Sequence, residues 1–307
     1  MQLVYKFILN RNSVLVFAVI LGLVAGDFAA YLQSYTFLAL AITMSFSMTG
    51  IGMKALLNPQ TMVKPMLVGA LLNYIVFGLL VITLAYYTMP TPQLFYGFVV
   101  IAAAPPGVAI VPFSYILKGD VEYSIAGVLG AFLFSVVIAP LYVSIFANHE
   151  GVSSYSLFIM MVQLVIIPLV VSRFLLYKPI FKYIEPIRGK IVDWGFAVLI
   201  FVAVGMNRAV FFGSPTILLL VGGVLLMVTF GLGTIYAVFA TRFGVSAPRV
   251  TTQTMLVTIK SSGFSVFTAL TLFGKEAAIP SAILAVIVLL YLIFLSIKGS
   301  KQKIVAS

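Results

Sequence analysis

The chain has 307 residues, of which 63% are hydrophobic and only 8% are charged, and its mean hydropathy is +1.20. Charge this scarce over the whole length excludes a soluble globular domain and predicts an integral membrane protein. The formal net charge is +11, but the basic residues are spread over loops without aromatic platforms, which indicates contact with anionic lipid headgroups and no nucleic-acid partner.

Ten apolar windows of about 20 residues follow one another along the chain and fill it. The first window lacks a small-residue cleavage site, so we expect a retained helix there and not a signal peptide. The predicted fold is an all-α membrane protein with spans near 14–32, 36–53, 66–88, 93–117, 121–147, 155–172, 192–212, 215–240, 250–273 and 277–297.

The basic residues predict the orientation, because Lys and Arg in short loops stay on the cytoplasmic side. With both termini cytoplasmic, only Arg208 and Lys275 fall outside, against 15 basic residues inside. The inside set is Lys6, Arg11, Lys54, Lys64, Lys118, Arg173, Lys178, Lys182, Arg188, Lys190, Arg242, Arg249, Lys298, Lys301 and Lys303. The short loops suit a multi-pass protein of a bacterial inner (plasma) membrane.

The basic stretch "RFLLYKPIFKYIEPIRGK" at 173–190 is the one segment that resembles a linker. It divides the chain into two sets of five spans, which we assign to residues 1–150 and 151–307. The fourth span of each set is interrupted, by "AAAPPGVAI" at 102–110 and by "IKSSGFSV" at 259–266. Because five is odd, the second set must be inverted relative to the first. Inverted repeats with broken helices in matching positions are typical of secondary transporters.

A broken helix frees backbone donors and acceptors that lipid cannot satisfy, so such breaks are tolerated where they line a cavity or an ion site. Half-helices that start after Gly107 and Gly263 would direct their positive N-terminal ends into that space, which suits an anion. The alternative is a Pro/Gly kink in each span without any ligand.

Lys260 lies near the middle of the ninth span, about ten residues from either end. A central charge costs about 2.5–3.5 kcal/mol on insertion scales, so we expect a functional role. The alternatives are snorkelling to an interface or pairing with a structural carboxylate. The carboxylates nearest the spans, however, fall at predicted span ends: Asp27, Asp120, Glu122 and Asp193.

No constellation of residues predicts an enzyme. The single histidine, His149, falls in a predicted external loop, and the sequence contains no HExxH, no nucleophile with a base at a plausible spacing and no phosphate-binding glycine loop. With no cysteine there is no thiolate metal site. We expect no catalytic residue and no metal centre.

Three segments resemble the bile acid:sodium symporter family, and the resemblance covers essentially the whole chain. "SFSMTGIGMKAL" at 45–56 is similar to the family's FxMGLxL segment, and "PPGVAIVPFSYILKGD" at 105–120 to its PGGxxSNxxTxLAKGD signature. "KSSGFSVFTALTLFGKEAAIPSAI" at 260–283 resembles its QNSGLAxALAxxxFGPxAALPxAI element. The resemblance implies discontinuous crossing helices 4 and 9, a core domain from spans 3–5 and 8–10, and a panel domain from spans 1, 2, 6 and 7.

The chain departs from the family at the positions that the resemblance assigns to sodium ligands. The first sodium site maps onto Ile110, Val111, Ser124, Val128 and Leu256, where four of five oxygen-bearing side chains are missing. The second site maps onto Leu256, Asn73 and Lys260. We therefore expect no bound sodium. Lys260 is predicted to replace the cation and to donate to Asn73 and to carbonyls released at the break.

The resemblance implies a small organic anion as substrate, carried by alternating access. The predicted cavity lies by Asn73, Gly107, Val108, Lys260, Ser261, Ser262 and Gly263. Transport is expected to be independent of sodium, with a proton on Lys260 as the possible coupling ion, because desolvation favours a neutral lysine.

Two alternatives keep the fold and change the function. One is a sodium symporter with a site rearranged around Ser124, Asn73 and backbone carbonyls. The other is a channel or sensor that does not cycle. Gly50, Gly69 and Gly78 suit close helix contacts, either within one chain or between chains, so the oligomeric state stays open.

Overall fold

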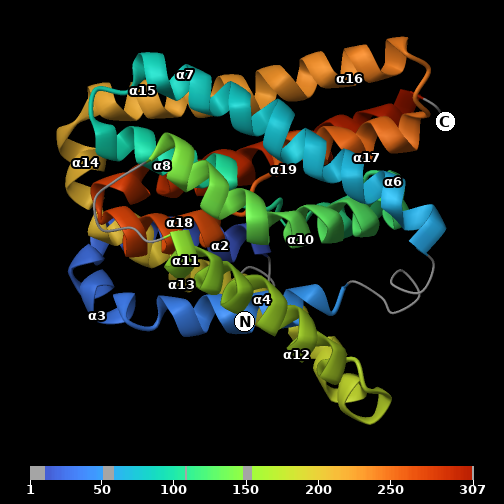
Figure 1. The fold of residues 1–307 in the computed structure, drawn as a ribbon, viewed down its shortest axis with the longest axis horizontal. Helices are drawn as coiled ribbons and strands as arrows, with labels where there is room; N and C mark the ends of the chain where they lie inside the picture. The colour runs from blue at the N-terminus through green and yellow to red at the C-terminus, as the bar shows by residue number, and fades with distance from the viewer. Residues whose placement is uncertain (1–10, 51–58, 108, 148–153, 306–307) are drawn as a thin grey trace.

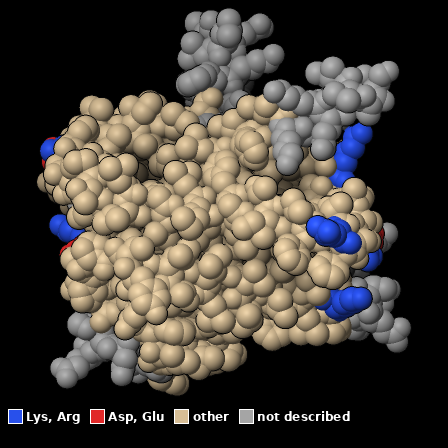
Figure 2. Space-filling view, turned by 90° about the horizontal axis from the view of Figure 1, so that it is seen from above, with Lys and Arg blue, Asp and Glu red and all other residues tan. Residues whose placement is uncertain are grey.

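The computed structural model describes residues 11–50, 59–107, 109–147 and 154–305 (Figure 1). Helices make up nearly all of this part, and many of them run close to the longest axis of the molecule. Figure 2 shows the charged side chains at the two ends of this axis, with a broad uncharged belt between them. Such a belt is what a lipid bilayer requires. Val108, His149 and the second part of the 45–56 segment lie outside the described residues.

The first part of the chain is built from helices joined by short turns. They are α2 (Arg11–Val24), the 3-10 helix η1 (Gly26–Phe28), α3 (Ala29–Gln33), α4 (Thr36–Met48), α6 (Pro59–Ala70), the π-helix η2 (Leu71–Leu79), α7 (Leu80–Thr88), α8 (Pro92–Ala103), α9 (Ile110–Ile116) and α10 (Val121–Phe146). Helices α6, η2 and α7 follow one another without a break.

The second part continues in the same way. It comprises α11 (Ser154–Met161), the π-helix η3 (Val162–Ile166), α12 (Ile167–Leu175), α13 (Lys178–Met206), α14 (Arg208–Gly213), α15 (Pro215–Leu226), the π-helix η4 (Met227–Gly231), α16 (Leu232–Arg242), α17 (Ala247–Thr258), α18 (Ser262–Phe273), the 3-10 helix η5 (Glu276–Ala278) and α19 (Ile279–Val305).

Six of the described helices are long and apolar enough to cross a membrane, and a bent pair at the start of the chain raises this to seven. Three shorter apolar helices, α4, α8 and α18, fall below that length. The chain is thus an all-helical, multi-pass membrane protein. Two of the three short helices, α8 and α18, border the interruptions at 102–110 and 259–266.

Two expectations about the spans were wrong. The first span is not a continuous helix over 14–32, because the chain turns by 93° between Ser13–Val24 and Gly26–Gln33. The supposed linker at 173–190 is helical except for a turn at Leu176 and Tyr177. Pro179 stands in the first turn of α13, where its missing N–H costs nothing, so the helix begins 14 residues before the predicted 192.

The helices pack in two groups that Figure 1 separates vertically. In the lower group, α13 contacts α2 and α4, and α12 contacts α4. Elsewhere α10 contacts α6 and α8, and α17 contacts α16. The contact between α6 and α10 is close, since a Cβ added at Gly69 would lie 2.5 Å from the carbonyl oxygen of Gly127. Gly69 therefore serves packing within one chain.

Candidate functional site

The first interruption follows α8. Pro105 and Pro106 have no N–H to continue the helix, and each disfavours helical geometry in the residue before it. Ala104 accordingly adopts extended angles, with φ −63° and ψ 144°. The chain resumes as a helix only at Ile110, so the last carbonyls of α8 have no helical donors.

The second interruption separates α17 from α18 without any proline. Ile259 has φ −97° and ψ 108°, and Ser261 has φ −76° and ψ 92°. The Ser261 side chain makes no capping hydrogen bond to α18. Local sequence alone does not account for this break, and its backbone groups find their partners in the first interruption.

The two interruptions cross and pair as a single antiparallel bridge between Pro106 and Lys260. The Gly107 N–H donates to the Ile259 carbonyl at 2.9 Å, and the Ser261 N–H donates to the Pro105 carbonyl at 2.9 Å. Backbone groups that would be unsatisfied in a membrane are thus paired with each other. Gly107 permits this approach, because a Cβ there would lie 3.0 Å from Ile259 Cγ2.

The Lys260 side chain is sealed beneath this crossing and is 1% exposed. Its Nζ donates to the carbonyl oxygens of Ala104 at 2.6 Å, Ala102 at 3.0 Å and Asn73 at 3.2 Å. The rings of Tyr74 and Phe77 lie 5.0 and 5.2 Å away, within range for cation–π attraction. A lysine ammonium has three hydrogens, so its donor capacity is used in full.

These carbonyls are available for physical reasons. Ala102 and Ala104 end α8, where helix carbonyls lack donors and the helix dipole is negative, which favours a cation. Asn73 lies in η2, where π-helical geometry replaces the regular α-helical hydrogen bonds. The next carbonyl in η2, that of Tyr74, also accepts a side-chain hydrogen bond, from the Tyr142 hydroxyl at 2.8 Å.

The charge of Lys260 is balanced by dipoles and ring faces. Among the described residues, Arg208 pairs with Asp27 and Arg249 pairs with Asp120, and neither ion pair involves Lys260. The Asn73 amide donates through Nδ2 to the Ala104 carbonyl at 3.2 Å, while its buried Oδ1 has no partner. Three carbonyl oxygens and two rings, all from η2 and the end of α8, therefore surround one ammonium group.

The positions that correspond to the first sodium site are mostly apolar and closed. Ile110, Val128 and Leu256 are at most 1% exposed. The Leu256 side chain lies against Gly127, where an added Cβ would be 2.7 Å from it. Ser124 is buried, and its hydroxyl donates to the Val121 carbonyl at 2.7 Å. Together with Val111, these residues offer a cation one hydroxyl, and that hydroxyl is engaged.

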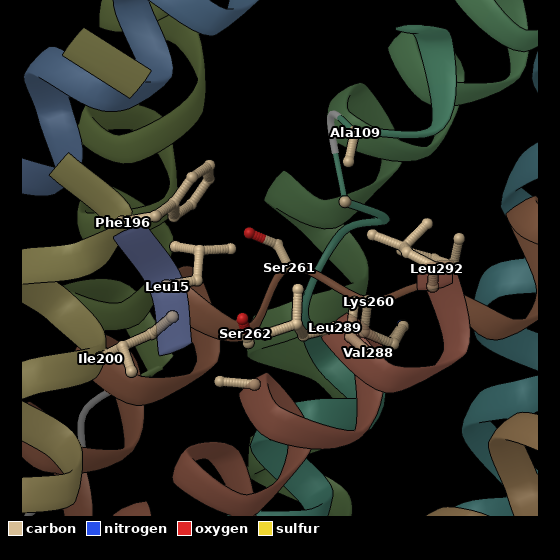
Figure 3. Close-up of a pocket in the computed structure, with 13 residues that line it drawn as sticks. Leu15, Ala109, Phe196, Ile200, Lys260, Ser261, Ser262, Val288, Leu289 and Leu292 are labelled. Atoms are coloured by element: carbon tan, nitrogen blue, oxygen red, sulfur yellow. The ribbon is translucent and has the colours of Figure 1, made fainter. Parts of the chain in front are cut away.

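Some of the predicted substrate residues border a cavity of about 40 Å³ beside the crossing (Figure 3), whereas Asn73 and Gly263 are not part of its lining. Ser261 faces Phe196 across it, and Ser262 and Gly107 also line it. Gly263 packs against the Phe196 ring and a methyl group of Leu199, both of α13. This volume holds a few water molecules and is too small for an organic substrate.

A larger cleft of about 570 Å³ opens between α4 and α13 on one side and α9 and α10 on the other. Ala109 lines both the cleft and the small cavity, and it separates the two spaces. The charged residues that line the cleft are Arg188 and Asp193, both of α13. Sequence reasoning placed Arg188 only among the cytoplasmic basic residues. The sequence pattern that would have identified Arg188 is the amphipathic helical periodicity, which extends α13 towards the N-terminus beyond residue 192.

Among the described residues, no group of three or more His, Asp or Glu side chains is placed to hold a metal ion. The main chemical feature of this geometry is a buried ammonium at the crossing of two broken helices, with a cleft nearby.

Comparison with known proteins finds two similarities. A model of the Sodium Bile acid symporter family matches residues 37–214, more than half of the chain. The chain is also similar to the protein described as "Probable sodium/metabolite cotransporter BASS1, chloroplastic" of Arabidopsis thaliana, with 25% identity over 261 residues. The match covers 82% of this chain and 63% of that relative, so the chain spans less than two thirds of the relative's length.

Proposed function

The chain belongs to the Sodium Bile acid symporter family of transporters, and from this premise we propose that it is a sodium-independent secondary carrier of small organic anions. The family is one of transporters and not of enzymes. The observation that carries the proposal is the ammonium of Lys260, held by three carbonyl oxygens where the family resemblance expects a sodium ligand. Lys260 acts as a tethered cation that keeps the broken helices in place.

Electrostatic repulsion supports the proposal that this chain has no bound sodium ion. A metal cation beside the Lys260 ammonium would be repelled, and it would find the carbonyls of Ala102 and Ala104 already engaged. The five positions of the first site supply only the Ser124 hydroxyl, and Na⁺ needs several oxygens to replace its water. Although the plant relative's name refers to sodium, the residues of this chain favour a carrier without it.

The proposed architecture is ten spans in two inverted repeats, residues 1–150 and 151–307. Pro106 and Lys260 pair at the crossing, and their numbers differ by 154. Adding 154 carries α8 (92–103) onto 246–257, where α17 (247–258) lies. The same shift carries η2 (71–79) onto 225–233, which contains η4 (227–231). The same offset of 154 residues relates both the helices that precede the two interruptions and the two π-helices, which supports an internal repeat.

The proposed domains follow the packing. A panel of spans 1, 2, 6 and 7 agrees with the contacts of α13 with α2 and α4, and of α12 with α4. A core of spans 3–5 and 8–10 contains both interruptions. The cleft and the small cavity lie between the two, as alternating access requires. At the other end of this interface the rings of Phe37 of α4 and Phe267 of α18 lie 5.7 Å apart and line a further cavity of about 440 Å³.

We place both termini in the cytoplasm and the protein in a cell inner membrane, because Lys and Arg predominate at that end. The cleft opens at this end, since it is lined by Gly50 and Arg188. With this orientation, the cleft would open to the cytoplasm.

A proton on Lys260 is the proposed coupling ion. Lys260 is one of the residues that line the small cavity, so a conformational change that opened this cavity to water would hydrate the side chain, and closing would remove that water. Hydration favours the charged form and desolvation the neutral form. Proton movement that accompanies substrate would support coupling, whereas a pH-independent rate would indicate a uniporter or exchanger.

The test is counterflow of a labelled organic anion in proteoliposomes, with Na⁺ replaced by choline. A sodium-independent carrier exchanges label equally in both media. Uptake that requires Na⁺ would overturn the proposal and support a rearranged sodium site at Ser124 and Asn73. Flux without counterflow would support a channel, because only a carrier that cycles exchanges label against an excess of unlabelled substrate.

A further inference from the structure

An apolar groove of about 220 Å³ lies on the panel, between α2 and α13. Every residue that lines it is aliphatic or aromatic, and one of them, Leu32, comes from α3. None of these residues lines the cleft or the small cavity at the crossing. The groove is therefore separate from the proposed route of the substrate.

Small residues form the floor of the groove and larger ones its rim. Val14, Ala18 and Ala197 line the floor, and each is only 4% exposed. Phe17 and Trp194 line the rim and are 46% and 43% exposed. Because the two alanines are short, an open channel remains between the large side chains. Such a channel favours hydrocarbon, since its lining offers almost no hydrogen-bonding group.

The groove follows two parallel helices. A Cβ added at Gly22 would lie 3.1 Å from the Phe201 carbonyl oxygen, and one added at Gly26 would lie 2.8 Å from the Gly205 carbonyl oxygen. The residue numbers of α2 and α13 therefore rise together along the contact. The first residues of both helices lie at the same end of the groove.

The length of the groove suits one leaflet of a bilayer. Its lining extends over residues 14–21 of α2 and 194–201 of α13, a length of about 10 Å at about 1.5 Å per residue. The hydrocarbon of one leaflet is about 15 Å thick, half of the bilayer core. Ala29, at the start of α3, packs against Gly205, so α3 and its Leu32 close the far end of the groove. The groove accordingly holds most of one acyl chain, and its other end faces the start of both helices.

Basic residues lie at that end. Lys190 is exposed and precedes Trp194 by four residues, so the two side chains share one face of α13. Among the described residues, Lys190 makes no hydrogen bond or ion pair. Trp194 is the only tryptophan of the chain, and tryptophan is typical of the headgroup level, where its ring lies in hydrocarbon and its N–H donates to polar groups. Because α2 begins at Arg11, both helices carry a basic residue at this end.

We propose that the groove binds an anionic phospholipid of the cytoplasmic leaflet. One acyl chain lies between α2 and α13, and the phosphate group lies beside the Lys190 ammonium and the Trp194 indole N–H. An apolar groove with a cation at one end matches a molecule that joins a long hydrocarbon chain to a negative headgroup. The bound lipid holds α2 against α13 and so stabilises the panel.

A second copy of the chain suits this groove less well than a lipid. Copies in one membrane share an orientation, so a two-fold axis lies along the membrane normal and brings each residue to the depth of its own counterpart. Lys190 and Arg11 of one copy would then lie at the level of the same residues of the other. Like charges oppose that contact, whereas a phosphate group neutralises them.

The experiment is native mass spectrometry of the purified protein after delipidation, titrated with dioleoylphosphatidylglycerol or with the zwitterionic dioleoylphosphatidylcholine. Wild type should bind the anionic lipid more tightly. Lys190→Gln should weaken the anionic lipid about fivefold, the effect of one lysine near a headgroup, and leave the zwitterionic lipid unchanged. Lys182→Gln is the matched control and should bind as wild type does, because Lys182 is an exposed lysine of the same helix, eight residues before Lys190 and further from the groove.

Two further variants test the acyl-chain part of the site. Ala197→Leu fills the floor and should weaken both lipids about equally. Trp194→Ala removes part of the rim at an exposed position, where the fold tolerates truncation, and should also weaken both. Phe243→Ala, at an exposed aromatic residue outside the groove, is the control for loss of a ring and should bind both lipids as wild type does.

Equal binding of the two lipids by wild type would overturn the inference, and so would a Lys190→Gln protein that binds the anionic lipid as tightly as the Lys182→Gln control. The same spectra show the mass of any dimer. A lipid-free dimer that Ala197→Leu dissociates would assign the groove to a second copy of the chain and would also overturn the inference. None of these outcomes bears on the carrier proposal, because the groove and the cleft share no lining residue.

Discussion

The Nζ of Lys260 lies 2.6 Å from the carbonyl oxygen of Ala104, a residue 156 positions earlier in the chain. The same oxygen accepts a hydrogen bond from Nδ2 of Asn73. One carbonyl at the end of α8 thus joins three spans. A cation in this place stabilises the fold through the negative end of a helix, a role that a bound metal ion can also perform.

Replacement of Lys260 by Met tests this role. Met preserves much of the length of the side chain but removes the ammonium that donates to the carbonyls of Asn73, Ala102 and Ala104, of which Ala104 keeps the hydrogen bond from Asn73 Nδ2. Each buried acceptor left unsatisfied costs about 1–3 kcal/mol, so for the two other carbonyls we expect a loss of at least about 2 kcal/mol of unfolding free energy. Thermal unfolding in detergent measures the change. The control is Lys182→Met, at an exposed lysine of α13, and a Lys260→Met protein as stable as this control would contradict the prediction.

Small amines should rescue Lys260→Ala. Truncation leaves a space that is lined by carbonyl oxygens and the Tyr74 and Phe77 rings. Methylammonium or ethylammonium can donate to these oxygens, and a ligand that binds only the folded state raises the melting temperature by mass action. Tetramethylammonium has no N–H and should fail, and wild type should respond to none of them. Equal effects of all three ions on the variant would show that the pocket does not recognise hydrogen-bond donors.

Gly69→Ala tests the close packing of α6 on α10. The new Cβ would lie 2.5 Å from the Gly127 carbonyl oxygen, so the helices must separate. Overpacking of this kind costs about 1–3 kcal/mol. Gly223→Ala is the matched control, because it lies inside a helix with nothing within 4 Å of the added methyl. The melting temperature of Gly69→Ala should fall while that of the control holds or rises, and a comparable decrease in both would disprove the packing argument.

Asp120 should stabilise α10 as a cap more than as an ion-pair partner. Its Oδ1 accepts from the Tyr123 N–H at 3.0 Å, and its Oδ2 lies 3.3 Å from Nε of the partly exposed Arg249. Loss of an N-cap lowers the free energy of unfolding by about 1 kcal/mol, and an Asn side chain is as effective a cap as an Asp side chain. Exposed ion pairs contribute about 0–1 kcal/mol. Asp120→Ala should therefore lower the melting temperature more than Asp120→Asn does, and equal losses would assign the effect to the ion pair.

The sequence permitted good prediction of the interruptions, because Pro105 and Pro106 cannot continue a helix and Lys260 is costly inside a membrane. Both breaks lie at the predicted places, and the membrane-spanning, all-helical class is confirmed. Composition is decisive in such cases, since a bilayer admits few backbone structures.

The partners of Lys260 were harder to predict. Asn73 contributes its backbone carbonyl to the ammonium, and this depends on the π-helix η2, for which no residue pattern is diagnostic. The other two carbonyls come from the opposite interruption, and only the crossing brings them near. Arg188 was missed as a cleft residue because its basic segment was taken for a linker, whereas α13 already begins at Lys178.

The backbone pairing between the two interruptions also affects the stability of the chain while it is being synthesised and inserted into the membrane. Synthesis runs from the N-terminus, so α8 enters the membrane before α17 exists. Until then the Gly107 N–H and the carbonyls of Ala102, Ala104 and Pro105 lack the partners that they have in the finished protein. The newly inserted first half is a destabilised intermediate, and the arrival of residues 259–261 completes its hydrogen bonds and brings its cation.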